Sequence, residues 1–418
     1  MAKTGEELFA ERSKRVDDAV QLKVPDRVPI MLFFNFFAAR YAGITYEDAF
    51  YEQGKWLAAN EKAVVDFKPD LYFQPNAAVF TSGKVHEILG NTQIKWPGHG
   101  VGPNTTFQFV EGEYMKAEEY DAFLDDPSDF SVRTYLPRIF SNLEGLSALP
   151  DFKFMLVGYA GAPMMCGILA LPPIADALQA LNEASLESIR WTAGYMEFDN
   201  KMAAMGFPVS TSAITLAPFD VISDFMRGMR GAMLDMYRCP DKLVAVQEKL
   251  LPTLIGAAVA QAQIGKNSRV FIPLHRGADG FMSLEQFESF YWPGLKALIM
   301  GLIDAGLTPC PLFEGAYDQR LEYLNELPAG KVVGMFDRSD LFRAKEVVGD
   351  NMCILGGMPL SLLQTGTIEQ VKEHTKKVIE AVGKDGGFIM SSNTVLDEAK
   401  PELVRAWVDA TREYGQYS

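Results

Sequence analysis

The sequence has few of the features that mark secreted or membrane-spanning proteins. It contains four cysteines, with no Cys-x-x-Cys pair among them: Cys166, Cys239, Cys310 and Cys353. Widely separated cysteines in mostly apolar surroundings predict buried, reduced thiols, which suit a reducing cytoplasm. No apolar run of about 18 residues is present, so the pattern favours a soluble globular protein over one that crosses a membrane.

The sequence also has fewer basic than acidic residues. The chain has 39 Lys and Arg against 54 Asp and Glu, a net charge of -15, and no stretch rich in Lys or Arg. Such an acidic protein repels nucleic acid and anionic lipid, so we expect neither nucleic acid nor a membrane as its partner. Residues 1–24 form a charged amphipathic helix pattern without an apolar signal region, which predicts neither secretion nor membrane insertion and favours a cytoplasmic location.

A repeated unit dominates the last 150 residues: a short apolar strand, a polar residue where it ends, and then a helix. The strands expected over residues 307–313, 331–336 and 387–390 end near Glu314, Asp337 and Asn393. Strands separated by helices run parallel, and the chemistry of parallel α/β folds lies at the carboxyl ends of the strands. The pattern predicts an α/β fold, specifically a (β/α)₈ TIM-type barrel, which needs about 250 residues.

The earlier part of the chain supplies the remaining strands. We expect them over residues 28–34, 70–74, 154–160, 208–213 and 269–274. Residues 75–150 change character, with Pro, Gly and Asn between short apolar pieces, and predict an insertion of loops and a hairpin beside the site. The sequence therefore predicts one barrel domain over residues 1–418, with an N-terminal helical extension and an insertion at about 75–150.

Four residues at expected strand ends are candidate catalytic residues: His275, Glu314, Asp337 and Asn393. The first three could also hold a metal, since imidazole and carboxylate groups are metal ligands. Each has a structural alternative. The histidine could bond to backbone, Glu314 could pair with Arg320 or Lys331, Asp337 could cap the helix that begins near residue 340, and Asn393 could belong to a turn.

Three further residues are candidates for lining the pocket or contacting a cofactor. Asn35 and Tyr159 follow early expected strands, while His99 lies in the Gly- and Pro-rich insertion, where it could reach over the pocket as part of a lid. A turn role for the asparagine, core packing for the tyrosine and simple exposure for the histidine are the alternatives.

Several segments resemble a known family in their order and spacing. They are Asp26-Arg27-Val28-Pro29, Ala217-Pro218-Phe219-Asp220, Val332-Val333-Gly334-Met335-Phe336-Asp337, Ile354-Leu355-Gly356-Gly357-Met358-Pro359, and Gly387-Phe388-Ile389-Met390 with Pro401-Glu402-Leu403-Val404. Together they resemble the uroporphyrinogen decarboxylase superfamily, a group of (β/α)₈ barrels that also contains cobamide-dependent methyltransferases. The resemblance is best from about residue 208 to 415 and poor from 75 to 150.

Two departures from the family pattern bear on function. True uroporphyrinogen decarboxylases carry an R-Q-A-G-R-Y stretch, and here Phe34 and Ala38 fall where its arginines would be. The family's histidine near the last strand is replaced by Asn393. Without an arginine clamp, an acidic protein is expected to bind a polycarboxylate substrate poorly.

The methyltransferase branch holds zinc through a His-x-Cys pair and a later cysteine. The matching positions here are Leu312, Glu314 and Asn393, so a thiolate zinc site is absent. Glu314, His275 and Asp337 would suit a Lewis-acid metal, with zinc as the candidate, that polarises an ether oxygen while its methyl group passes to a cob(I)amide.

The resemblance implies a corrinoid-dependent methyltransferase that moves a methyl group between a small molecule, such as a methoxylated compound undergoing O-demethylation, and a corrinoid. The chain has no D-x-H-x-x-G motif, so the corrinoid (cobalamin) would arrive free or on a corrinoid protein as partner. A homodimer is a further expectation. The alternatives are a decarboxylase of a porphyrinogen-like or other acidic substrate, and a non-catalytic protein that binds a corrinoid or tetrapyrrole.

Overall fold

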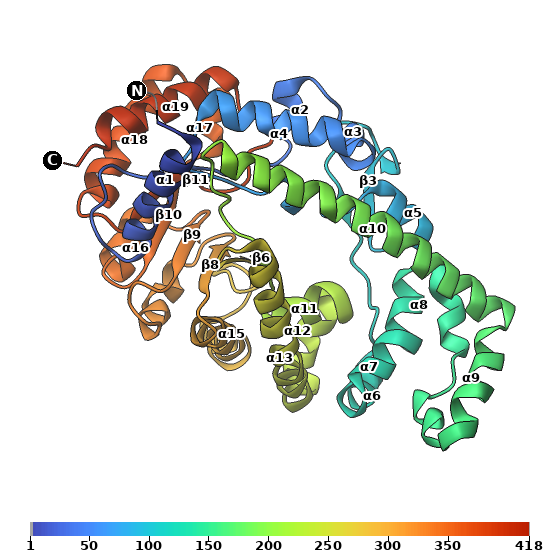
Figure 1. The fold of residues 1–418 in the computed structure, drawn as a ribbon. Helices are drawn as coiled ribbons and strands as arrows, with labels where there is room; N and C mark the ends of the chain where they lie inside the picture. The colour runs from blue at the N-terminus through green and yellow to red at the C-terminus, as the bar shows by residue number, and fades with distance from the viewer. Residues whose placement is uncertain (1–2, 418) are drawn as a thin grey trace.

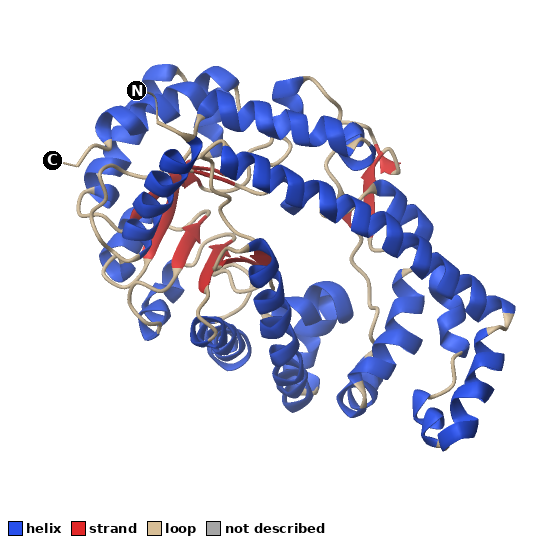
Figure 2. Cartoon of the chain, in the orientation of Figure 1, coloured by secondary structure: helices blue, strands red, loops and turns tan. Residues whose placement is uncertain are grey.

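The computed structural model describes residues 3–417 and shows parallel strands surrounded by helices, with a long arm on one side (Figures 1 and 2). Eight strands belong to the central barrel: β1 (Met31–Leu32), β2 (Leu71–Tyr72), β6 (Ala213–Ile214), β7 (Arg269–Leu274), β8 (Thr308–Phe313), β9 (Val333–Phe336), β10 (Cys353–Met358) and β11 (Phe388–Ser392). All pair in parallel, as helical connections require.

The ring closes through two short joints. Strands β6 to β11 form one continuous sheet in sequence order, while β1 and β2 form a separate pair. A parallel bridge between Tyr72 and Val209 joins β2 to the segment that leads into β6, and another between Ile30 and Met390 joins β1 to β11. Each strand thus lies beside its neighbours in sequence and the last lies beside the first, which is the expected (β/α)₈ arrangement.

Alternating side chains from the strands fill the barrel. Met31, Leu71, Phe271, Leu312 and Ile389 belong to one buried cluster, because successive strand residues point to opposite faces. Helix α1 (Gly5–Val20) contributes Val16, Ala19 and Val20 to the same cluster. The predicted N-terminal helical extension therefore packs against the barrel interior.

Helices on the outside complete the barrel. They are α2 (Phe37–Ala42), α3 (Tyr46–Tyr51) and α4 (Gln53–Phe67) after β1; α11 (Pro218–Val221), α12 (Gly228–Arg238) and α13 (Pro240–Gly265) after β6; α14 (Leu284–Gln286) and α15 (Trp292–Asp304) after β7; α16 (Leu341–Val348) after β9; α17 (Leu360–Thr365) and α18 (Ile368–Val378) after β10; and α19 (Pro401–Tyr414) after β11. A π-helix over Ile222–Met226 follows α11, and a 3₁₀ stretch over Asp318–Glu326 follows β8.

One helix among residues 3–417, α13, is long and apolar enough to cross a membrane by length and composition alone, and the bent pair formed by residues 158–169 and α10 passes only when taken together. Helix α13 packs against α15, α12 and β6 as part of the outer layer. Its Leu243, Val246 and Ala258 are buried there, as expected for a barrel helix.

The arm is the whole segment between β2 and β6. It contains α5 (Gly83–Leu89), a small sheet of β3 (Ile94–Pro97), β4 (Gly100–Val101) and β5 (Gln108–Phe109), then α6 (Tyr120–Asp125), α7 (Pro127–Phe130), α8 (Leu136–Ile139), α9 (Gly161–Leu169) and the 33-residue α10 (Pro172–Ala204). The insertion is thus larger and more helical than predicted, and it continues past residue 150. Leu143, Leu146, Leu149, Ile174 and Ala177 form a small core of its own.

Two expected strands need correction. Residues 154–160 form no strand: they lie in 3₁₀ turns over Phe152–Leu156 and Gly158–Ala160 near the arm tip, where Leu156 is 85% exposed. An apolar run predicts a buried strand only if a sheet is available to cover it, and none is near. The segment over 208–213 supplies the third barrel strand instead of the fourth, with its ladder shifted to Ala213–Ile214.

Candidate active site

His275 follows β7 directly and is held by a carboxylate from a neighbouring helix. Its Nδ1–H donates to Asp224 Oδ2 over 2.5 Å, and Arg276 Nη2 lies 2.8 Å from the other oxygen of the same carboxylate. Ser223 Oγ also donates to that oxygen over 3.0 Å. Asp224 lies in the π-helix Ile222–Met226, so this element fixes the orientation of the imidazole ring.

A second carboxylate, Asp220, anchors the backbone at the end of β7. It is fully buried and accepts the backbone N–H groups of His275 and Arg276 over 3.0 and 3.1 Å. The hydroxyl of Tyr291 donates to it over 2.8 Å. A buried carboxylate with three donors is satisfied, so Asp220 defines where the β7 end lies.

Glu314 follows β8 and faces the histidine. Its Oε1 lies 3.9 Å from His275 Nε2, and 43% of the side chain is exposed. Gly315 comes next with a φ of +84°, a left-handed conformation that favours glycine, and its N–H donates to Asp337 Oδ2 over 3.0 Å. The turn directs Glu314 toward the carboxyl end of β7.

These groups shift one another's proton affinity. Burial works against the charge on His275, but the hydrogen bond that His275 donates to Asp224 and the charges of Asp220, Asp224 and Glu314 outweigh it and raise the pKa to about 9. Burial raises the pKa of Asp220 to about 6 and also raises the pKa of Glu314. For Asp224, burial is outweighed by His275 and Arg276, and the pKa is lowered.

The arrangement provides an acid at the strand ends. With a pKa of about 9, His275 is an imidazolium at neutral pH. Its Nδ1–H donates a hydrogen bond to Asp224, and its Nε2–H lies on the side of Glu314. A partly exposed, oriented imidazolium can donate a proton to an oxygen that gains negative charge. The carboxylate of Glu314 stabilises the charged histidine, while burial raises the pKa of Glu314 itself.

Asp337 and Asn393 lie at the same end of the barrel, but their polar atoms bond to backbone. Asp337 follows β9 and accepts from Gly315 N–H, which ties β8 to β9. Asn393 follows β11, donates from Nδ2 to the carbonyl of Asp337 over 2.9 Å and accepts at Oδ1 from Gly357 N–H over 2.9 Å. The asparagine thus braces the ends of three strands.

The three expected metal ligands do not form a metal site. Among residues 3–417, no group of three or more His, Cys, Asp or Glu side chains is arranged to hold an ion. Asp337 accepts from Gly315 N–H, and the Nδ1 of His275 is bonded to Asp224, so these groups do not converge with Glu314 on one point. A zinc ion therefore finds no set of three ligands among the described residues.

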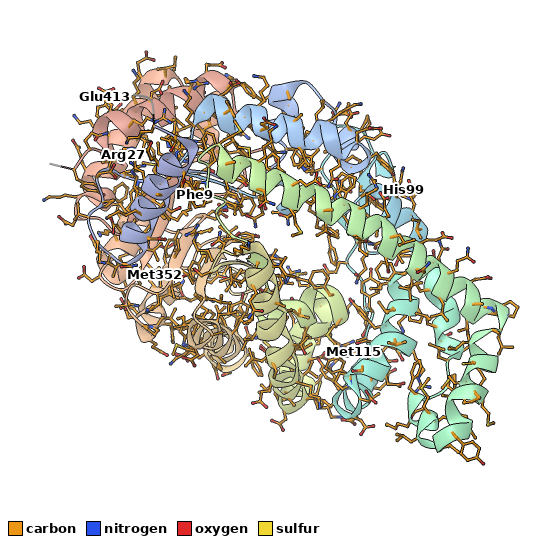
Figure 3. The ribbon with its side chains drawn as sticks, viewed as in Figure 1. Phe9, Arg27, His99, Met115, Met352 and Glu413 are labelled. Carbon is orange, nitrogen blue, oxygen red and sulfur yellow. The ribbon has the colours of Figure 1, made fainter. Side chains whose placement is uncertain are left out.

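None of the three expected pocket residues is hydrogen-bonded to this pair within residues 3–417. Asn35 follows β1 and donates to Asp397 Oδ1 over 2.9 Å. His99 is in the arm's small sheet, away from the barrel strands, and stacks on Trp96 with 4.2 Å between ring centroids (Figure 3). Tyr159 is 97% exposed near the arm tip and lines no part of the site, because the strand expected to carry it does not exist.

Sequence reasoning missed Asp220 and Asp224 as site residues. Both lie on helical turns after β6. The rule that places chemistry at the carboxyl ends of strands does not point to residues on such turns. Their four-residue spacing places both carboxylates on one helix face, and that pair within an apolar stretch was the available signal. Arg276 was visible beside His275, but its bond to Asp224 was not.

A parallel (β/α)₈ barrel with an acid–base group at the carboxyl ends of its strands is the architecture of a barrel enzyme. A family model described as "Uroporphyrinogen decarboxylase (URO-D)" matches residues 176–414, which is more than half of the chain. The chain therefore belongs to the uroporphyrinogen decarboxylase family, as the motifs predicted.

The curated relatives are distant. The uroporphyrinogen decarboxylase of Syntrophotalea carbinolica is 24% identical over 232 residues, 55% of this chain and 65% of that protein. The uroporphyrinogen decarboxylase of Danio rerio is 23% identical over 228 residues, 53% of this chain and 59% of that protein. The chain thus spans a little under two thirds of the length of these relatives.

A solved structure shares the fold over nearly the whole chain. A methyltransferase from Methanosarcina mazei superposes with a TM-score of 0.60, covers 99% of both chains and has 14% sequence identity. At that identity the likeness establishes the barrel fold alone.

Proposed function

We propose that this protein is a methyltransferase that removes the methyl group from an ether oxygen of a small methoxylated molecule and passes it to a corrinoid. The observation that carries the proposal is the placement of His275, whose Nδ1 is bonded to Asp224 and whose Nε2 lies on the side of Glu314. With its pKa raised to about 9, this ring is the proton donor of the site. Ether cleavage creates an oxyanion, and a positioned acid is the group that such a step requires.

The step balances with one proton donor. A reduced corrinoid, supplied free or by a corrinoid protein, would be the acceptor and would supply the electron pair for the new bond to the methyl carbon. The carbon–oxygen bond breaks, its electron pair stays on oxygen, and His275 Nε2–H protonates that oxygen. Solvent then returns the proton to His275, which Asp224 keeps in place throughout.

His275 supplies what a Lewis acid would otherwise supply. The thiolate positions are absent, and the residues at the strand ends do not form a metal cluster within the described chain. A proton donor in a partly desolvated site lowers the energy of the departing oxygen by placing positive charge where negative charge develops. The shared fold with a methyltransferase from Methanosarcina mazei supports the same class of reaction.

The surroundings of β1 count against decarboxylation of a polycarboxylate. Phe34 and Ala38, where the family's arginines fall, are buried, and Phe34 stacks on Phe37 with 5.2 Å between centroids. Near His275 lie the carboxylates of Asp220, Asp224 and Glu314, with Arg276 already bonded to one of them. A multiply charged anion would meet repulsion from these carboxylates.

The test is to mix the purified protein with cob(I)alamin and a series of methoxylated aromatic and aliphatic compounds, and to follow methylcobalamin by its absorbance. We expect methylcobalamin and one equivalent of demethylated product, with a rate at least about 100-fold lower in His275→Gln. The variant Glu322→Gln, at an exposed residue that pairs with Arg343, is the control and keeps the wild-type rate.

Two results would contradict the proposal. Release of carbon dioxide from a porphyrinogen without cobalamin would make the protein a decarboxylase. Binding of a corrinoid without turnover of any donor, unchanged by His275→Gln, would indicate a non-catalytic carrier of the cofactor.

A further inference from the structure

Helix α10 carries an apolar stripe on the side that faces away from the protein. Trp191, Tyr195, Phe198 and Met202, spaced by four, three and four residues, are buried against the barrel and its helices. Leu186, Ile189, Ala193 and Met196, spaced by three, four and three residues, are exposed. At about 100° per residue the two sets lie on roughly opposite sides of the helix.

The exposure of this stripe is large for aliphatic side chains. Leu186 is 64% exposed, Ile189 68% and Met196 47%. A surface helix normally places polar residues opposite its buried face, and a helix that is apolar on both faces is normally covered on both. The outer face of α10 is therefore built to be covered by something outside this chain.

The stripe continues toward the tip of the arm. Leu178 lies on the same side of α10 and is exposed, and before the helix come the exposed Leu171, Met164 and Leu156. Residues 154–175 contain no charged side chain, in a chain with 22% charged residues. Figure 1 shows α10 running the length of the arm from the barrel to α9, so the apolar surface follows the arm.

We propose that this surface is a dimer interface, in which the α10 helices of two copies of this chain pack antiparallel about a twofold axis. With the axis midway between residues 189 and 193, Ile189 packs beside Ala193 of the partner subunit and Leu186 beside Met196 of the partner subunit. Three- and four-residue spacing is the pattern by which two helices interdigitate. A twofold interface uses the same patch on both copies, as the stripe requires.

Charges beside the stripe favour the antiparallel direction. Arg190 and Glu197 lie one heptad apart on the same flank, and Arg190 is 59% exposed and pairs only with Glu187 among residues 3–417. When the two helices run antiparallel, Arg190 faces Glu197 of the partner subunit. The twofold axis repeats this contact, so Glu197 also faces Arg190 of the partner subunit. Helical side chains lean toward the amino terminus, which shortens the axial offset between the two groups.

A second copy fits this surface better than a lipid bilayer does. The arm flanks the stripe with Asp176, Glu183, Glu187 and Glu197, and the whole chain has a net charge of -15. Such a rim is repelled by anionic lipid, whereas Arg190 supplies each copy with the cation that its partner's carboxylate needs.

The test is the mass of the full-length protein in solution, measured by light scattering after gel filtration and by sedimentation over a dilution series. We expect a dimer for the wild type and a monomer for the double variant Leu186→Glu and Ile189→Glu, with the dissociation constant raised about 30-fold or more per residue. Ile264→Glu on α13, at a side chain that is also 64% exposed, is the matched control and leaves the dimer intact. Circular dichroism confirms that each variant is folded.

A charge exchange tests the direction of packing. Glu197→Arg places like charges together and weakens the dimer roughly 3- to 10-fold, and adding Arg190→Glu restores it. A wild-type monomer at concentrations of the order of 100 µM would overturn the proposal and leave the face to a different protein or a lipid surface. A dimer that survives both glutamate substitutions would overturn it too, because the interface would then lie elsewhere.

Discussion

At the scale of single residues, the charge of His275 depends on two opposing effects: burial lowers its pKa, and the neighbouring carboxylates raise it by more. Burial alone would favour the neutral ring, yet Asp224, Asp220 and Glu314 raise the pKa to about 9. A histidine with an ordinary pKa of about 6.5 would be mostly neutral at pH 7.5 and could not act as the proton donor. The function proposed for the site therefore depends on the carboxylates that surround His275.

The replacement Asp224→Asn tests this dependence. Methyl transfer by the wild type should decline as pH rises through about 9, because His275 loses its proton there. Removing the Asp224 carboxylate should move this decline down by on the order of 1 to 2 pH units. The pH profile of kcat/KM measures the shift, and an unchanged profile with an intact fold would show that Asp224 does not tune the acid.

The same shift has a consequence for stability. Because the pKa is raised from 6.5 to about 9 on folding, the stabilisation by charged His275 is complete below about pH 6.5 and is lost as pH rises through 9.

Glu314→Gln should slow methyl transfer while leaving stability nearly unchanged. The side chain is 43% exposed, so its removal creates no cavity, but the charge that faces His275 Nε2 is lost. We expect kcat to fall about 10- to 100-fold, with the His275 pKa lowered and the melting temperature unchanged. Stopped-flow formation of methylcobalamin and thermal unfolding measure the two effects, and equal activity in the variant would limit Glu314 to a structural role.

At the scale of elements, the π-helix Ile222–Met226 links the arm to the site. The carbonyl of Phe225 accepts from the Tyr135 hydroxyl over 2.8 Å, and the carbonyl of Met226 accepts from the N–H groups of Tyr114 and Met115 over 2.8 and 2.7 Å. These donors belong to the arm, while Asp224 on the same π-helix holds His275. The arm thus steadies the element that orients the proton donor.

Helix α1 is tied to β1 and β2 by a buried ion network. The carboxylate of Asp70 is fully buried and accepts from Arg15 Nη1 over 2.7 Å, from both Nη atoms of Arg27, and from Ile30 N–H over 2.9 Å. Loss of one member of such a network leaves buried charge unpaired.

Asp70→Asn should therefore destabilise the protein by roughly 2 to 4 kcal/mol, as measured by urea unfolding. The control is Asp409→Asn, whose side chain is 57% exposed and 3.6 Å from Arg412, and which should change stability by less than about 0.5 kcal/mol. Similar losses in the two variants would mean that the buried network does not tie α1 to the barrel.

At the scale of the whole molecule, the outer part of the arm has a core of its own. It consists of Leu143, Leu146, Leu149, Ile174 and Ala177, whereas side chains of the inner part of the arm share one cluster with the barrel. We expect the outer part of the arm to open without the barrel, since cooperative units follow contiguous cores.

Gly145 provides the means to test this separation. A Cβ at this position would overlap the carbonyl of Pro173, where the 3₁₀ stretch over residues 141–148 meets the start of α10. Gly145→Ala should weaken the arm by about 1 to 3 kcal/mol, seen as faster hydrogen exchange in residues 141–148 and 172–180 with unchanged barrel strands. Gly167→Ala on α9, where a Cβ meets nothing within 4 Å, is the control. Equal acceleration in the barrel would show a single cooperative unit.

The sequence predicted β7, β8, β9 and β11, because each is a mostly apolar run with a polar residue at its end, but it did not predict β10, which is followed by Pro359. It failed at residues 154–160, where an equally apolar run is exposed, since composition does not reveal what covers a segment. In the site, His275 and Glu314 were found from their places at strand ends. Asp224 was not, because its role depends on a helix whose position against β7 only the fold shows.

One of the two short bridges that close the ring lies where the arm is inserted, and the length of the chain can vary there. The arm leaves and rejoins the barrel on either side of the joint between Tyr72 and Val209, where little pairing has to be broken. The part matched by the family model begins at residue 176, so most of the arm lies outside it. Relatives can therefore lengthen, shorten or replace this segment while the six-stranded sheet that presents His275 and Glu314 keeps its register, and the surface offered to other molecules can evolve separately from the chemistry.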